Sequence, residues 1–401
     1  MGETGGGREI RVLMDFGASG RHHSLYDELL QAPPEGIRYV VPRLPVSRFP
    51  KAAVHIYHRI RSGLEGKVDL AAVARRVNRA AAGSGADHDV VHFANHLDPA
   101  REPFVADFEQ ALSLLHAPTG TGRVEADFAR IREARTRLME SAECKFLLPW
   151  TEQGAKTVWA AFPSAKIRKK TKVVRLAMRV PEEHKPIKHD KFRVLFLGTS
   201  NLSGEWNFYY RGGHRMLKVF ERFARGRKGS VELVVTGEIP QRERPLTERI
   251  GCCRAAGLLR KEEMGHLFRT SDVLLYPAYA TPGLAFLEAM RYHMPIATTD
   301  AWANREIVGH MENGLVTPFT EFKTRGKFGL PPMLDAFMDF ELNCSDTGLE
   351  NGLVQSLEKL YGSPRLRSRL GENGFRQVSA GKCSIGERNR RLRKIYEACL
   401  S

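Results

Sequence analysis

A glutamate on the first turns of an expected helix has the most readable chemistry in this sequence. The chain runs from a strand expected at 272–276 into a loop, and the following helix begins near Gly283 and carries Glu288. A carboxylate there would accept two hydrogen bonds from a ribose diol, while the amides of Gly283 and Leu284 would hold a phosphate. A glutamate near a helix start also complements the helix dipole, which is a common structural role. The spacing alone favours neither interpretation.

A glycine-containing loop after the first expected strand is a second candidate for phosphate contact. Gly17 to Gly20 follow the strand expected at 10–16, and Arg21, His22 and His23 come next. Glycines let a backbone approach a ligand closely, and amides at a helix start favour a phosphate. The loop lacks the full glycine pattern of dinucleotide sites, so a tight turn between strand and helix is the plainer interpretation.

Two histidines flank the end of another expected strand. His92 and His96 surround the end of the strand expected at 89–93, where side chains can face a ligand, although most such histidines are packing or surface groups. No third ligand lies nearby, so the pattern predicts no metal site. Trp150–Glu152 end a further strand, and an acceptor contact there is a hypothesis.

The elements that position these residues alternate between strands and helices. Several strands are apolar on consecutive residues, which is typical of strands buried on both faces of a parallel sheet. The expected strands are 10–16, 37–41, 89–93, 103–108, 145–150, 172–176, 192–198, 231–237, 272–276, 295–299 and 314–318, and helices are expected at 52–60, 71–82, 124–142, 215–225 and 284–292, with 353–400 helical apart from a break near 380–384. This alternation predicts an α/β fold with doubly wound sheets.

A polar segment divides the chain into two domains. Residues 179–191 contain two prolines and show no apolar period, which indicates a linker. We therefore expect Rossmann-like domains at 8–180 and 192–383, facing each other across a cleft. In such sheets, ligands bind outside the carboxyl ends of the strands.

Composition excludes several classes of protein. The 401 residues are 42% hydrophobic and 27% charged, unlike disordered or collagen-like chains. No apolar stretch is long enough for a membrane span and no signal peptide precedes the first strand, so we expect a cytoplasmic protein. The six cysteines lack zinc-site spacing and indicate reduced packing thiols.

The charge is concentrated in one segment. The chain carries a net charge of +16, and residues 38–80 contain ten basic and two acidic side chains. Such a surface attracts anionic partners. We hypothesise a peripheral contact with an anionic membrane; a solvated basic face is the plainer interpretation. Nucleic acid is disfavoured, because the basic runs carry no recognised motif or aromatic stacking pattern.

Part of the sequence resembles a known family. Residues 192–320 look like the donor-binding half of GT-B retaining glycosyltransferases, in particular glycosyltransferase family 4 (glycosyl transferases group 1). The matching pieces, in order, are 194–198, 211–213, 231–237, 262–277, 283–290, 295–300 and 305–316. The resemblance extends more weakly over nearly the whole chain, and 384–401 resembles the family's last helix, which returns to the first domain.

The resemblance implies transfer of a sugar from a nucleotide-sugar donor, with retention at the anomeric carbon and without a required metal or other cofactor. Glu288 matches the second glutamate of the family's E-x7-E motif, which contacts ribose. Arg211 matches a phosphate-neutralising lysine, and arginine performs that role through bidentate contact. Gly20 matches the glycine loop near the donor diphosphate. The acceptor would be a glycan, a lipid-linked sugar or a small molecule.

Three departures from the family pattern stand out. The first glutamate of the motif is replaced by Ala280, so one contact with the donor sugar is missing or comes from elsewhere. A family arginine falls near Thr199, whose hydroxyl cannot neutralise charge. Glu109 follows a strand where many relatives place a histidine beside the reacting sugar. Glu109 would stabilise an oxocarbenium-like state or take the acceptor's proton, or it is an ordinary glutamate of a first helical turn.

The sequence therefore predicts a retaining glycosyltransferase. One alternative is a protein of this fold that binds a nucleotide sugar without transferring it, and Ala280 and Thr199 favour it. Another is a sugar-nucleotide epimerase, which no specific residue supports.

Overall fold

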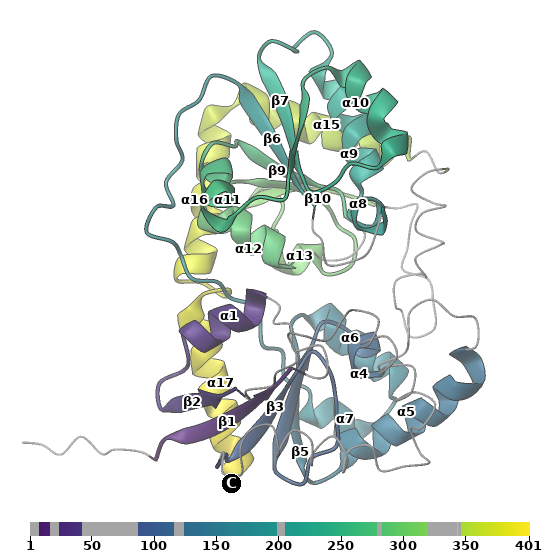
Figure 1. The fold of residues 1–401 in the computed structure, drawn as a ribbon, viewed down its shortest axis with the longest axis vertical. Helices are drawn as coiled ribbons and strands as arrows, with labels where there is room; N and C mark the ends of the chain where they lie inside the picture. Colours follow the sequence, from purple (N-terminus) through teal and green to yellow (C-terminus); the bar gives the residue numbers. More distant parts are fainter. Residues whose placement is uncertain are drawn as a thin grey trace, which may run out of the picture. The chain divides into compact units, whose positions relative to one another are not determined.

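Each of two units of the chain is built on a parallel β-sheet. The computed structural model describes residues 8–16, 24–41, 87–115, 124–198, 205–278, 283–319, 343 and 346–401. The first unit holds the chain up to Leu176 together with Gly386–Ser401, and the second holds Ala177–Gly326 and Pro331–Ile385. Figure 1 shows the elements of both units.

The first unit contains a five-stranded sheet in the order β2-β1-β3-β4-β5, with every pair parallel. Its strands are β1 (Ile10–Asp15), β2 (Ile37–Val40), β3 (Val90–Ala94), β4 (Phe104–Phe108) and β5 (Cys144–Pro149). All residues of β3 and β4 are buried. The strand order reverses between β1 and β3, and Asp15 pairs in register with Phe93. Loops after these two strands therefore meet at one edge of the sheet.

Helices cover both faces of this first sheet. The helices are α1 (Ser24–Gln31), α4 (Ala111–Leu115), α5 (Val124–Glu140), α6 (Glu152–Ala161), α7 (Ala165–Lys170) and α17 (Ile385–Leu400). Phe104, Ala106 and Phe108 pack into one apolar core with residues of α4 to α7. The alternate side chains of the same strand face the other side of the sheet, where Asp107 accepts a hydrogen bond from Tyr26 of α1. The sheet is thus doubly wound.

The second unit contains a six-stranded parallel sheet in the order β11-β10-β9-β6-β7-β8. Its strands are β6 (Phe192–Leu197), β7 (Val231–Thr236), β8 (Cys253–Gly257), β9 (Val273–Tyr276), β10 (Ile296–Thr299) and β11 (Gly314–Thr317). The order reverses between β6 and β9. In open α/β sheets a ligand binds outside the carboxyl ends of the strands at such a reversal.

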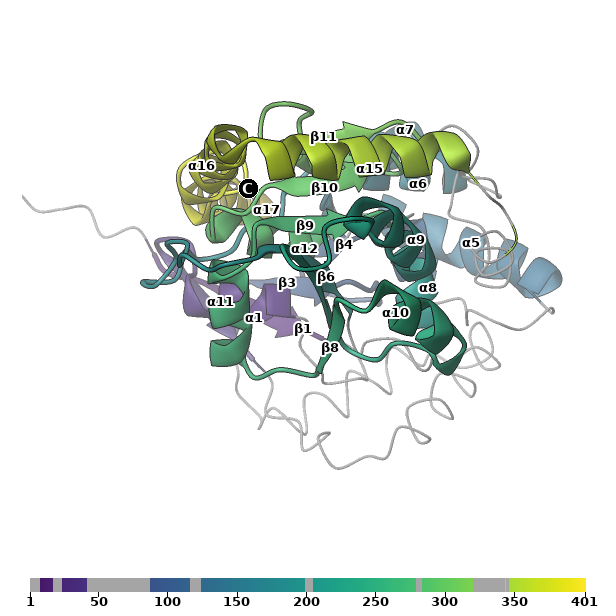
Figure 2. The ribbon, with the colours of Figure 1, turned by 90° about the horizontal axis from the view of Figure 1, so that it is seen from above.

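Helices also flank the second sheet on both sides. They are α8 (Trp206–Tyr210), α9 (Gly213–Ala224), the 3₁₀ turn η3 (Gln241–Glu243), α10 (Arg244–Ile250), α11 (Lys261–Arg269), α12 (Gly283–Arg291), α13 (Asn304–Ile307), α15 (Thr347–Gly362) and α16 (Pro364–Ser379). Figure 2 shows α15 running along β10, and α15 also packs on β11 and α9. The helix α12 packs against α16.

The predicted fold class is confirmed, with differences in single elements. The strand expected at 172–176 is an extended segment, because only its start bonds to β5, through Lys172 N to Leu147 O (2.8 Å) and Val174 N to Pro149 O (3.0 Å). The edge strand β8 lacks an apolar run and was not predicted. The C-terminal helical region breaks once more than expected, at Ser363, whose side chain caps α16 ahead of Pro364.

Several sequence expectations concern residues outside the described ranges. These are Gly20, Thr199, Ala280, most of the basic segment 38–80, and the helices expected at 52–60 and 71–82. The membrane contact through 38–80 and the cleft between the domains stay predictions. Among the residues described, five cysteines are free thiols, no helix is long and apolar enough to cross a membrane, and no group of three metal-ligating side chains gathers.

Candidate active site

The connection between α8 and α9 lies against the end of β9 in the second unit. Gly212 has a left-handed backbone (φ +77°), and a Cβ built on it would lie 2.3 Å from the carbonyl oxygen of Pro277. Only glycine therefore allows this close approach. The approach places the preceding residue, Arg211, beside the sheet edge where the strand order reverses.

Arg211 is oriented by the last residue of β9. Its Nη1 donates to the hydroxyl oxygen of Tyr276, and its guanidinium carbon lies 6.0 Å from the centre of that ring. Burial raises the pKa of Tyr276, and the positive charge of Arg211 opposes this rise. The Tyr276 ring also contacts Phe286 of α12 edge-on, with 6.1 Å between ring centres. Tyr276 therefore links the arginine to the helix that carries Glu288.

The helix α12 begins at Gly283 and Leu284, as the sequence predicts, and carries Glu288 on its second turn. The first amides of a helix have no partner within it and attract anions. The carboxylate of Glu288 is 26% exposed, and its Oε2 lies 2.8 Å from Nη2 of Arg291. The described residues after β9 thus include a helix start and an oriented carboxylate, and Arg211 contacts the last residue of the same strand.

His96 is the histidine that the first unit brings to a strand end. Its Nε2 lies 3.3 Å from Oδ1 of Asp15, the last residue of β1, and 3.9 Å from Oδ2 of Asp98. Its Nδ1 lies 3.1 Å from the carbonyl oxygen of Ala94. The pair spans β1 and β3, where the strand order of the first sheet reverses. Asp15 and Asp98 were not predicted, because nothing in the local sequence links them to His96.

His92 has a different position from the one predicted, and this is a correction. Its side chain is 1% exposed and lies inside the unit, with Nδ1 2.7 Å from the hydroxyl of Tyr396 on α17 and Nε2 3.2 Å from Oδ2 of Asp107. The side chain belongs to the face of β3 that α17 covers, so it packs the helix instead of facing the strand-end surface. This burial gives His92 a structural role in the packing of α17.

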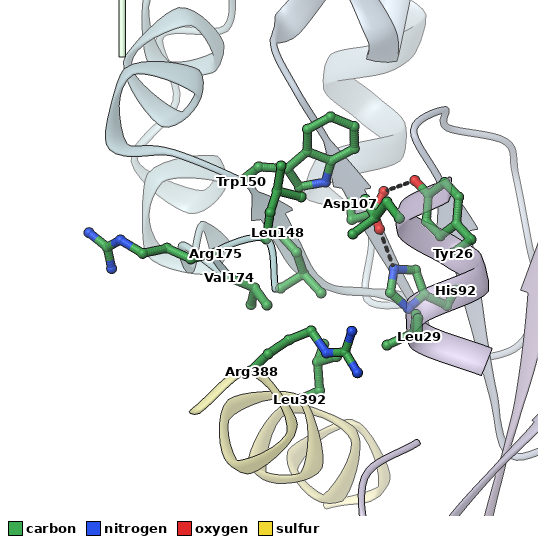
Figure 3. A pocket seen from close by; sticks show the side chains of 12 residues that line it. Tyr26, Leu29, His92, Asp107, Leu148, Trp150, Val174, Arg175, Arg388 and Leu392 are labelled. Carbon is green, nitrogen blue, oxygen red and sulfur yellow. Dashed lines mark hydrogen bonds and ion pairs between the residues drawn. The ribbon is translucent and has the colours of Figure 1, made fainter. Parts of the chain in front are cut away.

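Asp107 is the centre of this buried network, which is drawn in Figure 3. Its Oδ1 accepts from the hydroxyl of Tyr26 (2.6 Å) and from the amide of Asn95 (2.8 Å). Burial, followed by the negative charge of Asp107, raises the pKa of Tyr26, so the phenol remains a donor. The carboxylate therefore ties α1, β3 and, through His92, α17 to the middle of the sheet.

A cavity of about 30 Å³ adjoins the same network and is large enough for one water molecule. Its walls come from α1, the strands β3, β4 and β5, the extended segment after α7, and α17, as Figure 3 shows. Apolar side chains such as Leu29, Leu148 and Leu392 line much of it, with the Arg388 guanidinium among the polar groups. Its size excludes a nucleotide or a sugar.

Glu109 follows β4 and is half-buried. Its amide donates to Oδ1 of Asn95 (3.2 Å), whose own backbone is left-handed (φ 56°). A Cβ on Gly154 would lie 2.5 Å from the carbonyl oxygen of Glu109, so the start of α6 packs directly on this backbone. Asn95 and the packing of α6 fix Glu109 at the carboxyl end of β4.

Trp150–Glu152 lead into α6. The hydroxyl of Thr151 caps that helix by accepting from the amide of Gly154 (2.9 Å). The capping role explains this residue, and the hypothesis of an acceptor contact gains no support from its geometry.

Comparisons with known proteins agree with this geometry. Residues 191–323, which include every strand of the second sheet, match the family model described as glycosyl transferases group 1. Among curated proteins no relative matches the chain. The match to this family therefore falls within the second unit.

Solved structures extend the likeness to the whole chain. Sucrose-phosphate synthase from Thermosynechococcus elongatus matches with a TM-score of 0.62 at 13% identity, over 98% of this chain and 99% of that one. HepE from Anabaena, in complex with UDP and glucose, matches with a TM-score of 0.60 at 12% identity, over 98% of this chain and 100% of that one. WaaG, a glycosyltransferase involved in lipopolysaccharide biosynthesis, matches with a TM-score of 0.59 at 13% identity, over 96% of this chain and 99% of that one. The chain has the GT-B fold of these proteins.

Proposed function

We propose that this protein is a retaining glycosyltransferase that uses a nucleotide-sugar donor and requires no metal. The observation that carries the proposal is the contact of Arg211 with Tyr276 at the end of β9, together with α12, which begins after the same strand and carries Glu288. A nucleoside diphosphate has a diphosphate for the cation and the amides, and a ribose diol for the carboxylate. HepE, which shares the fold, has been solved with UDP-glucose.

Charge stabilisation at the leaving group is the main chemical task in this proposal. The bond between the anomeric carbon and the phosphate oxygen breaks, and its electron pair goes to the nucleoside diphosphate. Arg211 and the α12 amides offset the negative charge that develops there. The acceptor oxygen bonds to the same face of the anomeric carbon, and its proton goes to the Glu109 carboxylate or to the departing phosphate. The acceptor is a glycan, a lipid-linked sugar or a small molecule.

A second candidate is a protein that binds a nucleotide sugar without transferring it. Ala280 favours this candidate, because the side chain that contacts the donor sugar in relatives is missing there. The two candidates differ in turnover and share the nucleotide site.

The experiment is incubation of the protein with UDP-, GDP- and ADP-sugars in EDTA, with release of the nucleoside diphosphate followed over time. Water serves as the acceptor until a better one is found, and the anomeric configuration of the product is read by NMR before mutarotation. The proposal expects release from one donor with retained configuration. Donor binding without release would support the second candidate, and an inverted product would contradict retention.

A further inference from the structure

Arg291 is a buried cation at the end of α12, in direct contact with Glu288. Its side chain is 9% exposed, whereas that of Glu288 is 26% exposed. Nη2 of Arg291 donates to Oε2 of Glu288 (2.8 Å), and Nη1 donates to the carbonyl oxygen of Arg179 (3.4 Å). One guanidinium therefore bridges the candidate ribose ligand and the extended segment that precedes β6.

Aromatic packing restricts the position of this guanidinium. Its central carbon lies 5.3 Å from the centre of the Tyr292 ring. Tyr292 in turn stacks on Phe268 of α11, with ring centres 5.1 Å apart and planes inclined by 4°. Because the guanidinium is planar and its donors diverge at fixed angles, fixing its plane also fixes the direction from which it holds Glu288.

The segment that supplies Arg179 is itself fastened to the end of α12. Nδ1 of His184 lies 2.9 Å from Nε2 of His293, and the two rings stack with 5.1 Å between their centres. The backbone carbonyl that Arg291 binds therefore belongs to a segment held at a second point. This makes it a firm anchor for the arginine.

Burial distinguishes this ion pair from an ordinary one. Pairs of opposite charge three residues apart on a helix are common and contribute little when exposed. A buried guanidinium must be partnered, and its loss would leave Glu288 without the group that orients it. An exposed pair in the same unit, between Arg249 and Glu221, provides a contrast, since the Arg249 side chain is 64% exposed.

We propose that Arg291 is a positioning residue that holds the Glu288 carboxylate in the orientation that binds the ribose diol. The inference rests on the proposed function, because it assigns a support to the nucleotide site of that proposal. Arg291 does not touch the nucleotide. It binds Oε2 of Glu288 from a fixed direction, so that the carboxylate is already oriented when the ribose diol binds. Discrimination between ribose and deoxyribose then depends on Arg291 as well as on Glu288.

The test compares binding of UDP, GDP and ADP with binding of their 2′-deoxy counterparts by calorimetry. For the diphosphate that the wild-type protein binds, we expect the ribonucleotide to bind about tenfold more tightly than the deoxynucleotide, the size of one hydrogen bond to a charged group. We expect this ratio to fall towards one in Glu288→Gln and in Arg291→Met. The matched control Arg249→Met should keep the wild-type ratio.

The outcomes distinguish a failure of this inference from a failure of the proposed function. If the ratio falls in Glu288→Gln but stays at the wild-type value in Arg291→Met, the inference is wrong and the ribose assignment stands. If the wild-type protein binds none of the diphosphates, the proposed function fails and the inference fails with it. A merely structural role for Arg291 would weaken both nucleotides equally. If Arg291→Met does not fold, Arg291→Lys replaces it, with an intermediate ratio expected and an unchanged ratio counting against the inference.

Discussion

The carboxylate of Asp107 lies 3.2 Å from Nε2 of His92, and Nδ1 of the same histidine contacts the hydroxyl of Tyr396 on the C-terminal helix α17. The middle of the first sheet is thereby joined to the end of the chain, since His92 and Tyr396 are 304 positions apart. The same carboxylate holds the amide of Asn95, which supports the backbone of Glu109. The buried Asp107 carboxylate therefore helps to position α17 and also supports the loop at the strand end.

Removal of this acid should destabilise the first unit. Asp107→Ala leaves the Tyr26 hydroxyl and the Asn95 amide without their acceptor and removes the carboxylate beside His92, and we expect a loss of about 3 kcal/mol in the free energy of unfolding. Urea titration followed by tryptophan fluorescence measures it, since Trp150 lies in this unit. Asp87→Ala is the control, because Asp87 is 88% exposed and its pair with Arg11 spans 3.5 Å. Equal midpoints for the two variants would contradict the role given to Asp107.

The close approach at Gly212 should tolerate no side chain. Gly212→Ala forces a Cβ to within 2.3 Å of the Pro277 carbonyl oxygen, whereas a Cβ built on Gly226, also left-handed (φ +74°), would have no atom within 4 Å. Gly226→Ala should cost only the left-handed strain of about 1 kcal/mol. Gly212→Ala should cost about 2 kcal/mol more and should weaken nucleotide binding, because Arg211 shifts. Unfolding and calorimetry on the pair test this; similar losses in both variants would refute it.

Protonation of His293 should weaken the second unit in mild acid. Burial lowers the pKa of His293 below its usual 6.5, despite the opposing charge of Glu372, and His184 and Lys185 lower it further. The unfolded chain therefore binds this proton more readily than the folded chain does, so the contribution is complete above about pH 6.5 and is lost as the pH falls below that value. We expect melting temperature to fall less steeply between about pH 7 and pH 5 in His293→Asn.

Asparagine is the matched replacement at this position, because His293 has a left-handed backbone (φ 57°) that asparagine tolerates. The slope of melting temperature against pH is the quantity to compare, since the loss of ring stacking on Phe375 lowers stability at every pH. Parallel slopes in wild type and variant would show that His293 does not titrate in this range.

The proposed role of Glu109 predicts a change in turnover without a change in nucleotide affinity. Glu109→Gln removes the carboxylate that would take the acceptor's proton, and we expect turnover to fall about 100-fold or more. Affinity for the nucleoside diphosphate should stay the same, because Glu109 is not among its proposed ligands. Glu102→Gln, at the amino end of the same strand, is the control. Normal turnover in Glu109→Gln would identify Glu109 as an ordinary loop residue.

The sequence predicts most of the fold because the sheets are buried on both faces. Runs such as Val194–Leu197 and Val273–Tyr276 are apolar at every position, which no exposed strand can be. The edge strand β8 escapes this signal, since its residues are half-buried or exposed. Residues 172–176 were predicted as a strand and form an extended segment instead, because β-propensity does not reveal that their pairing with β5 stops after Val174.

The candidate site is predictable only where the backbone creates it. Gly283 and Glu288 follow from a strand end and a helix start, which the sequence marks, and Arg211 follows from the family resemblance. The side of the sheet that His92 faces does not, because β3 is buried throughout and an alternation of burial is absent. The role of Arg291 is also hidden, since a glutamate and an arginine three residues apart suggest an exposed pair until their burial is known.

The central claim is that the second unit binds a nucleoside diphosphate through Glu288. The most direct measurement is a thermal-shift panel of UDP, GDP, ADP, CMP and TDP, with and without Mg²⁺, on the wild-type protein and Glu288→Ala. At a ligand concentration of about 100 Kd, binding adds roughly 2.7 kcal/mol to stability and raises the melting temperature visibly. We predict a rise with one diphosphate, indifferent to Mg²⁺ and much reduced in Glu288→Ala. No rise with any nucleotide, or an equal rise in the variant, would contradict it.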